Sequence, residues 1–307
     1  MFLMAFFVLR RVFYFPRSLQ LSMFPPLLFA FLAAALWASA DLFSKRAVAK
    51  VEPVLAVFWA QLFGVLPFVA LFALSPSAFP VTLFWPVALA GLLASLGYVY
   101  FFKGLNLERV SLVQPLINTD GLVAAAISML FLSEAITSLK VAALLLAVSG
   151  VLLATFSLER MRRREVIFSR GSLYGLVSSF SFGLSLVITK LLLASISPLS
   201  AVVFYDAFIV VFLFVYLVAV RKFSLISFSQ VAVLFPSGVL DTAAFGCFYL
   251  ALLSLPSSIV SPLATTGAVV VLVVLSKFFL KERLSTQEKI GVALIVLAIA
   301  LLSLESA

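Results

Sequence analysis

Long apolar segments separated by short polar connections dominate the pattern of hydrophobic and polar positions along this chain. A helix that crosses the hydrocarbon core of a bilayer needs about 20 mostly apolar residues, and ten segments of about this length are present. We predict transmembrane helices over residues 25–44, 53–74, 84–103, 109–132, 139–157, 171–192, 199–220, 230–252, 257–279 and 287–304. The expected fold class is an all-α integral membrane protein.

The two halves of the chain carry the same marker residues at a nearly constant spacing. The pairs separated by 145 to 148 positions are Trp37 and Phe182, Lys45 and Lys190, Pro53 and Pro198, Gly91 and Gly238, Pro115 and Pro262, and Glu134 and Glu282. Five predicted helices fall in each half. Because five is odd, the second half must enter the membrane from the side opposite to the first. We therefore predict a 5+5 inverted repeat, an architecture typical of secondary transporters.

These boundaries divide the chain into four parts. The first repeat spans residues 25–157 and the second spans 171–304, and a basic linker over 158–170, with five arginines, joins them. Residues 1–24 are apolar but too short and too interrupted to cross a bilayer. We expect either an interfacial helix there or a true start at Met23, and we assign this segment no function.

Composition supports a membrane protein and removes several mechanisms. Hydrophobic residues make up 64% of the 307 positions and charged residues 11%, whereas soluble domains have about 45–50% and about 25%. The chain has no histidine and a single cysteine, which excludes histidine-based triads, histidine metal clusters and thiolate metal sites. We expect no enzyme activity, no metal and no cofactor. The net charge of +9 fits loops that face an anionic membrane surface, not a nucleic-acid partner.

Polar residues on one face of the predicted fourth helix recur in the ninth. Gln114 and Asn118 lie four residues apart and so share a helix face, and the offset of 147 carries them to Ser261 and Thr265. Lipid cannot satisfy such groups, so we expect this face to line a solute cavity. The alternative is hydrogen bonding between helices, which small hydroxyl residues often provide in membranes.

The predicted third and eighth helices combine aromatic and polar residues in a similar way. Ser95 and Tyr98 lie on one face of the third helix, and Thr242 and Tyr249 lie on the corresponding face of the eighth. Aromatic walls with a few polar groups are the usual make-up of a small-molecule site. We therefore predict that these four residues contact the substrate.

Acidic residues inside the predicted spans are the sharper signal, because a charge at membrane depth is costly and usually marks a pathway or a pair. Asp41, Asp120, Asp206 and Asp241 occupy such positions. A carboxyl group in a low-dielectric surrounding favours its protonated form and can carry a proton near neutral pH. We predict that one of the four couples transport to protons. On a continuous helix, Asp120 would lie about 200° around the axis from Asn118, away from the polar face.

Two repeat-related lysines, Lys45 and Lys190, lie near the ends of the first and sixth predicted helices. Two cationic groups at matching positions are candidate binding sites for an anionic solute. The alternatives are side chains that extend to the membrane interface and, for Lys45, an ion pair with Asp41 one turn earlier.

Three features together resemble the EamA-type family of the drug/metabolite transporter superfamily, over about residues 25–304. They are Trp37 followed eight residues later by Lys45, the pair Pro115 and Pro262, and the pair Glu134 and Glu282. The resemblance implies ten helices, alternating access, export of small metabolites, and a central cavity lined by helices 1, 3, 4, 6, 8 and 9. We also predict that Trp37 contacts the substrate. The family usually has a second proline six residues after the first. Here those positions hold Gly121 and Ala268, which allow close helix approach.

We therefore expect a secondary transporter of small organic metabolites such as amino acids, nucleobases or drug-like solutes, working as an exporter by alternating access and proton antiport. The expected partners are the solute and the lipid of the cell (inner or plasma) membrane, and the protein is a monomer or a homodimer. The alternative is a membrane-embedded sensor or scaffold without transport. The orientation has two alternatives, because the Lys and Arg distribution places both termini outside, whereas members of the family resemble one another in having cytoplasmic termini.

Overall fold

The computed structural model describes residues 26–74, 76–77, 79–108, 110–155, 169–279 and 286–305. Within these residues the chain is helical and has no strand. The predicted N-terminal segment 1–24 and nearly all of the predicted linker 158–170 lie outside the described residues.

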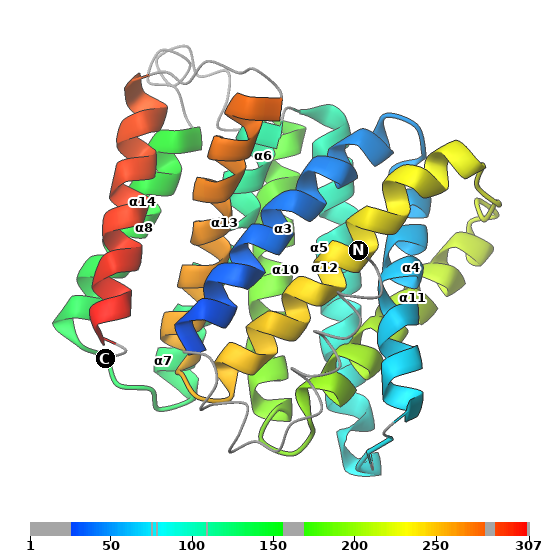
Figure 1. Ribbon diagram of the computed structural model, residues 1–307, viewed down its shortest axis with the longest axis horizontal. Helices are drawn as coiled ribbons and strands as arrows, with labels where there is room; N and C mark the ends of the chain where they lie inside the picture. Colours follow the sequence, from blue (N-terminus) through cyan, green and yellow to red (C-terminus); the bar gives the residue numbers. More distant parts are fainter. Residues whose placement is uncertain are drawn as a thin grey trace.

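Each of the ten predicted segments contains a helix (Figure 1). The first half contributes α3 (Pro26–Val48), α4 (Pro53–Leu74), the short 3-10 helix η1 (Val81–Leu83), α5 (Phe84–Leu107), α6 (Val110–Ile117), α7 (Asp120–Phe131) and α8 (Ser138–Thr155). The second half contributes α10 (Arg170–Leu192), α11 (Pro198–Ala219), α12 (Phe228–Leu252), α13 (Ser257–Phe279) and α14 (Thr286–Glu305).

Seven spans among the described residues are long and apolar enough to cross a membrane: α3, α4, α5 with η1, α10, α11, α12 and α13. Helices α7 and α8 are apolar but shorter. The chain is therefore a multi-pass membrane protein. That it crosses the bilayer ten times stays a prediction.

Local sequence fixes where several of these helices begin. Ser197 caps α11, because its hydroxyl accepts from the amide of Ser200 at 3.2 Å, and Pro198 follows at the first helical position, where no N–H is needed. Helix α12 begins with a capping box, in which Ser227 and Gln230 each bond the backbone of the other. These serines satisfy amides that a helix start would otherwise leave without partners.

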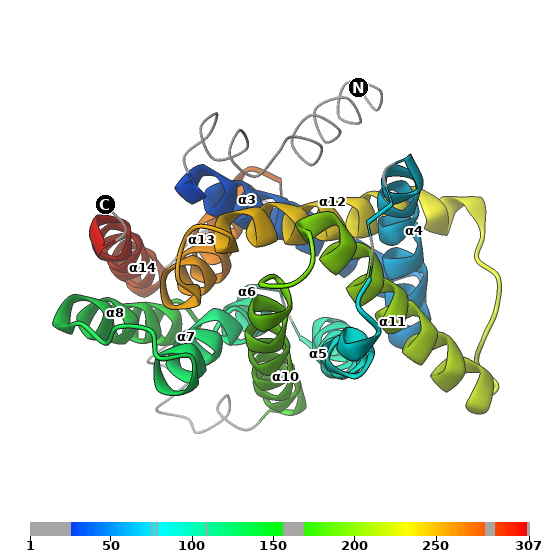
Figure 2. The ribbon, with the colours of Figure 1, turned by 90° about the horizontal axis from the view of Figure 1, so that it is seen from below.

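The helices of one repeat pack largely against those of the other, and the contacts are reciprocal (Figures 1 and 2). The first helix of each repeat lies on the third helix of the other, so α3 packs on α12 as α10 packs on α5. The second, fourth and fifth helices contact their own counterparts, namely α4 on α11, α7 on α13 and α8 on α14. Such reciprocity is what two repeats related by a two-fold rotation require. That this axis lies in the membrane plane stays a prediction.

Glycines allow two of the contacts between repeats to be very close. Where α4 crosses α12, a Cβ atom added to Gly238 would lie 1.8 Å from the carbonyl oxygen of Ala60. Where α7 meets α13, a Cβ atom added to Gly121 would lie 2.1 Å from the hydroxyl oxygen of Thr265. Larger residues at either glycine would force the helices apart.

The predicted fourth helix over 109–132 is not continuous. It is divided into α6 and α7 by a turn at Asn118 and Thr119. At this turn the hydroxyl of Thr119 donates to the carbonyl of Leu116 at 2.7 Å, and the carboxylate of Asp120 accepts from the amide of Gly121 at 2.7 Å. Side chains thus replace part of the backbone hydrogen-bond ladder. Discontinuous helices of this kind often form binding sites in transporters.

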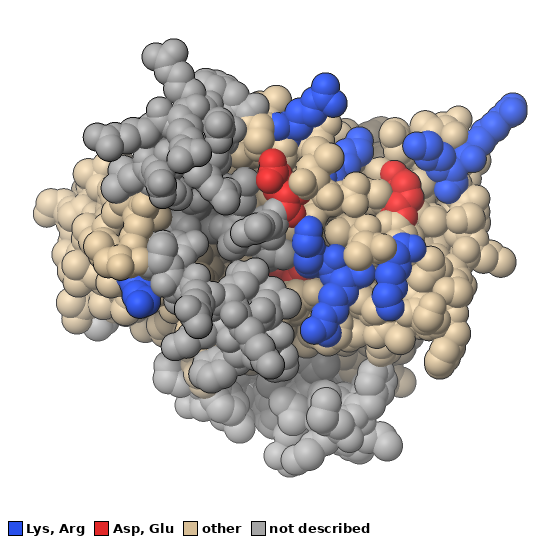
Figure 3. Space-filling model, turned by 90° about the horizontal axis from the view of Figure 1, so that it is seen from above, with Lys and Arg blue, Asp and Glu red and all other residues tan. Residues whose placement is uncertain are grey.

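Basic side chains gather at one end of the bundle, where α3 ends and α12 begins (Figure 3). Lys45 and Arg46 lie in the last turn of α3, and Arg221 and Lys222 follow α11. Helix α14 ends at the opposite end of the bundle (Figure 1). The positive-inside rule places the basic end in the cytoplasm and therefore predicts that the C-terminus lies outside it. The Lys and Arg distribution along the sequence predicts the same orientation, whereas the family resemblance implies the opposite one.

Candidate functional site

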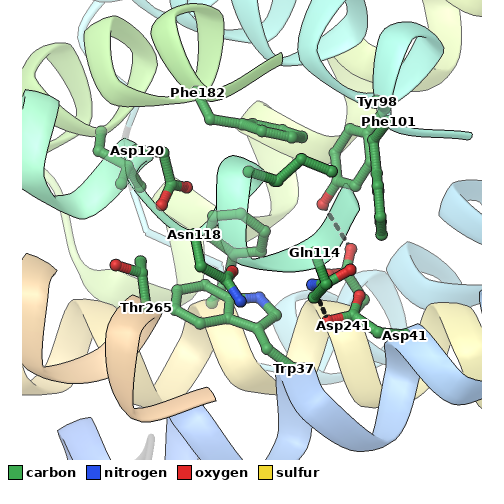
Figure 4. A pocket seen from close by; sticks show the side chains of 13 residues that line it. Trp37, Asp41, Tyr98, Phe101, Gln114, Asn118, Asp120, Phe182, Asp241 and Thr265 are labelled. Atoms are coloured by element: carbon green, nitrogen blue, oxygen red, sulfur yellow. Dashed lines mark hydrogen bonds between the residues drawn. The ribbon is translucent and has the colours of Figure 1, made fainter. Parts of the chain in front are cut away.

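A pocket lies between the two repeats, where six of the ten predicted segments meet (Figure 4). The space between the protein atoms there is about 460 Å³, open solvent at its mouth included. The lining residues come from α3, α5, α6, α7, α10, α12 and α13: Trp37, Asp41, Tyr98, Phe101, Gln114, Ile117, Asn118, Asp120, Phe182, Leu186, Asp241, Phe245 and Thr265. These elements coincide with helices 1, 3, 4, 6, 8 and 9 of the ten predicted.

Much of the lining consists of residues that correspond to one another in the two repeats. The corresponding pairs are Trp37 and Phe182, Asp41 and Leu186, Tyr98 and Phe245, and Asn118 and Thr265. Because both members of each pair line the same space, the pocket lies near the two-fold axis that relates the repeats. Its acidic residues break this symmetry, because none of them has an acidic counterpart in the other repeat.

The aromatic wall contains two ring-to-ring contacts that correspond to each other in the two repeats. Trp37 lies edge-on to Phe245, with 5.1 Å between ring centroids and 80° between ring planes. Phe182 lies edge-on to Tyr98 at 4.8 Å and 86°. Since Trp37 corresponds to Phe182 and Phe245 to Tyr98, the second contact repeats the first. Edge-to-face pairs of this kind hold aromatic rings in fixed orientations.

Asp241, on α12, is held by two side chains of the first repeat. The hydroxyl of Tyr98 donates to its carboxylate at 2.5 Å, and the amide of Gln61 donates at 2.9 Å. Both donors are neutral, so the carboxylate gains hydrogen bonds but no compensating charge. Asp241 thereby joins α4, α5 and α12 at the wall of the pocket.

Asp41, on α3, is held in a similar way by Gln114 of α6, whose side-chain amide nitrogen donates to its carboxylate. This bond fixes the orientation of the Gln114 amide, because the NH₂ group must face the carboxylate. The other side-chain atom, Gln114 Oε1, is buried and has no hydrogen-bond partner. The buried Nδ2 of Asn118 also lacks a partner. Two polar atoms at the lining are therefore unsatisfied.

Asp120 lines the pocket together with Asn118, although a continuous helix would have placed them about 200° apart. The expectation was wrong because the helix is interrupted between them. The turn lets Asn118 close α6 and Asp120 open α7, and both side chains reach the same space (Figure 4). The break therefore brings a third carboxyl group to the pocket, beside Asp41 and Asp241.

The remaining predicted substrate residues lie behind the lining. Ser95 donates to the carbonyl of Gly91 at 2.7 Å, and Thr242 donates to Asp206 at 2.8 Å. Their hydroxyls thus serve contacts within and between helices, the alternative that the sequence left open. Tyr249 and Ser261 are likewise buried and do not line the pocket. A contact with the solute stays a prediction for these four residues. Asp206 is also buried outside the lining, and its role in proton coupling stays a prediction.

The two repeat-related lysines make equivalent bonds away from the pocket. The ammonium group of Lys45 donates to the carbonyls of Leu105 and Glu108, at 2.5 and 2.8 Å. The ammonium group of Lys190 donates to Leu252 and Leu255, at 2.5 and 3.1 Å. Each lysine therefore caps the carbonyl end of α5 or α12, where a positive charge is favoured. A role as anion sites stays a prediction.

The prediction left out five apolar lining residues: Phe101, Ile117, Phe182, Leu186 and Phe245. An apolar residue of a membrane helix carries no sign of whether it faces lipid, another helix or a cavity. The repeat itself offered a signal for two of them, because Phe182 and Leu186 are the counterparts of Trp37 and Asp41.

A duplicated helical bundle with a pocket between its halves defines a repeat-built membrane protein of the kind found among secondary carriers. The family model of the EamA-like transporter family matches residues 24–156 and again 169–304, and the chain belongs to this family. A solved structure titled "Crystal structure of protein" is similar in fold, with a TM-score of 0.72 and 17% identity over 92% of this chain and 98% of the other. No curated protein matches the sequence.

Proposed function

We propose that this protein is a secondary transporter of small organic solutes, which works by alternating access as a proton-coupled exporter in the cell (inner or plasma) membrane. Membership of the EamA-like transporter family supports transport as such. The direction of export follows the family resemblance. The acting unit is a monomer or a homodimer.

One observation carries the proton coupling, namely the presence of Asp41, Asp120 and Asp241 around one pocket. No Lys or Arg is among the residues that line it. An ionised carboxylate at membrane depth is costly unless it is paired or solvated. Each of the three therefore favours either a proton or a solute that compensates its charge.

Competition between protons and solute yields antiport. When the pocket faces the acidic side, protons occupy the carboxyl groups and favour release of the solute. When it faces the other side, loss of the protons favours solute binding. Transport is then driven by the different affinities of the two states, as any ligand-driven population shift must be. Because the repeats contact each other reciprocally, exchanging their roles would open the pocket to the opposite side.

A flux measurement tests this function. The purified protein is reconstituted into liposomes that contain a pH-sensitive dye, an acid gradient is imposed, and amino acids, nucleobases, sugars and organic cations are added in turn. We expect solute-dependent proton movement with one class. No proton movement and no solute uptake with any class would contradict transport and favour the sensor or scaffold alternative.

Single substitutions identify the coupling carboxyl group. Asp41→Asn, Asp120→Asn and Asp241→Asn each remove one group that lines the pocket. We expect at least one to abolish pH-driven uptake while solute exchange without a pH gradient continues. Asp206→Asn removes the fourth predicted coupling group, which is buried outside the lining. Glu52→Gln is the control, because it neutralises an exposed carboxyl group that lies outside the pocket. Retention of pH-driven uptake by all three pocket variants would contradict proton coupling at these residues.

A further inference from the structure

We propose that the solute of this pocket is an organic cation, an amine or guanidine on an apolar or aromatic body. This inference rests on the proposed transport function and narrows its substrate class. Three features of the pocket carry it: uncompensated carboxyl groups, an aromatic wall, and a buried acceptor without a donor.

The first feature is the charge of the lining. Its titratable side chains are Asp41 from α3, Tyr98 from α5, Asp120 from α7 and Asp241 from α12, and the residues from α6, α10 and α13 add none. Among them, the three carboxyl groups are much stronger acids than the Tyr98 phenol, and each becomes negative when it loses its proton.

No cation of the described chain neutralises these groups. Lys45 lies one turn after Asp41, yet its ammonium group donates to carbonyls at the end of α5. Lys190 lies one turn after Leu186 and donates to carbonyls at the end of α12. The positive charge that would balance an ionised pocket must therefore arrive as protons or as the solute. An anionic solute would add a further negative charge to a low-dielectric site.

The second feature is the aromatic wall, to which Trp37, Tyr98, Phe101, Phe182 and Phe245 contribute. The faces of aromatic rings attract ammonium and guanidinium groups, and Trp does so most strongly. The same rings provide apolar area for the body of the solute. An aromatic site that also contains carboxylates binds cations by both effects at once.

The third feature is the pair of unsatisfied polar atoms. Gln114 is 2% exposed and Asn118 is 7% exposed, so the lack of a partner at Gln114 Oε1 and Asn118 Nδ2 is costly. Both residues line the pocket (Figure 4). The N–H groups of an ammonium or guanidinium would satisfy Gln114 Oε1, and a neutral oxygen on the solute would satisfy Asn118 Nδ2. A ligand with a cationic end and one acceptor therefore completes the site.

A binding series that varies only charge tests the proposal. Phenethylamine, 2-phenylethanol and phenylacetate share one aromatic body and are cationic, neutral and anionic at pH 7. We expect phenethylamine to bind the purified protein in detergent at least about tenfold more tightly than the other two, measured by calorimetry. Protons compete for the same carboxyl groups, so its binding weakens as the pH falls. Equal or tighter binding of phenylacetate or 2-phenylethanol, or binding of none of the three, would overturn the proposal.

Substitutions of the pocket carboxyl groups test whether the preference for phenethylamine arises in this pocket. Asp41→Asn, Asp120→Asn and Asp241→Asn each reduce the preference for phenethylamine over 2-phenylethanol, whereas Glu52→Gln, at an exposed carboxyl group outside the pocket, preserves it. Because the preference is a ratio of two affinities within one protein, a uniform loss of folded protein does not alter it. A preference that all three pocket variants retain in full would contradict the assignment.

A parallel flux experiment separates this proposal from the proposed function. Benzylguanidine stays protonated near neutral pH, so little of it crosses the bilayer as a free base, and it keeps the N–H donors that Gln114 Oε1 requires. If phenethylamine and benzylguanidine are preferred in binding and benzylguanidine drives no proton movement in liposomes, proton-coupled transport fails and the cation preference stands. If a neutral or anionic solute drives protons while phenethylamine does not bind, the cation preference fails and transport stands.

Discussion

Lys190 and Glu134 hold opposite sides of the turn that joins α12 to α13. The ammonium group of Lys190 donates to two carbonyls at the end of α12, and the carboxylate of Glu134 accepts from the amides of Ser257 and Ser258, both at 2.8 Å. The cation therefore meets a helix C-terminus and the anion meets a helix N-terminus, as the helix dipoles favour. Since Glu134 follows α7 and Lys190 lies on α10, the turn is joined to both repeats.

Glu134→Ala is expected to destabilise the protein. The substitution leaves two amides of α13 without their acceptor and should cost about 2 kcal/mol, seen as a lower thermal midpoint in detergent. Glu52→Ala is the matched control, because the exposed Glu52 accepts a single amide hydrogen bond, from Leu55. Equal losses in the two variants would show that the carboxylate of Glu134 does not hold α13.

Lys45→Met and Lys190→Met should lower the thermal midpoint by similar amounts, because the two ammonium groups make equivalent bonds in the two repeats. Hydrogen bonds from a charged donor are worth about 1.5–3 kcal/mol each, and methionine keeps most of the apolar stem. Lys222→Met, at an exposed lysine, serves as the control and should change little. Unchanged stability together with lost binding of an anionic solute would instead favour the anion-site hypothesis for these lysines.

Gly238→Ala is expected to disturb the crossing of α4 and α12. Its new methyl group would approach the carbonyl oxygen of Ala60 to 1.8 Å, so the two helices must separate, at a cost of about 1–3 kcal/mol. Gly267→Ala adds the same atom where the nearest neighbour lies at 3.3 Å, on Ala34, and should cost much less. The thermal midpoints of the two variants are compared in the same detergent, and we expect the lower midpoint for Gly238→Ala. Similar midpoints for both variants would contradict the close crossing of α4 and α12.

The helical fold could be predicted because each apolar segment is long, and the family because its marker residues recur at one offset. The break between α6 and α7 could not be predicted. It falls at Asn118 and Thr119, where neither proline nor glycine stands. Asparagine and threonine also occur inside continuous helices, so these residue types alone do not mark a break.

The candidate site could be predicted where polar atoms reveal it. Asp41, Asp120 and Asp241 are conspicuous because charge is rare in an apolar span, whereas Phe101 and Ile117 resemble any other buried apolar residue. Hydroxyl groups give a weaker signal, because a serine such as Ser95 can donate its hydrogen bond to a carbonyl of its own helix.

Trp37 should report on occupancy of the pocket, and its repeat counterpart should be able to replace it. The chain has three tryptophans, and among them only Trp37 lines the pocket, whereas Trp85 is 77% exposed. A solute that stacks on the pocket wall therefore changes the fluorescence of Trp37. Trp37→Phe should abolish the change caused by phenethylamine, and Trp85→Phe should preserve it.

Moving the tryptophan from position 37 to the corresponding position 182 of the other repeat gives a stricter test of the shared pocket. The double variant Trp37→Phe with Phe182→Trp should restore a solute-dependent change, because Phe182 lines the same pocket from α10 and repeats the edge-on contact of Trp37. Binding is followed by calorimetry in parallel, so that a lost signal is distinguished from lost affinity. If the double variant binds phenethylamine without a fluorescence change, the two positions do not face one solute, and the pocket is not shared by the two repeats in the way that their reciprocal packing requires.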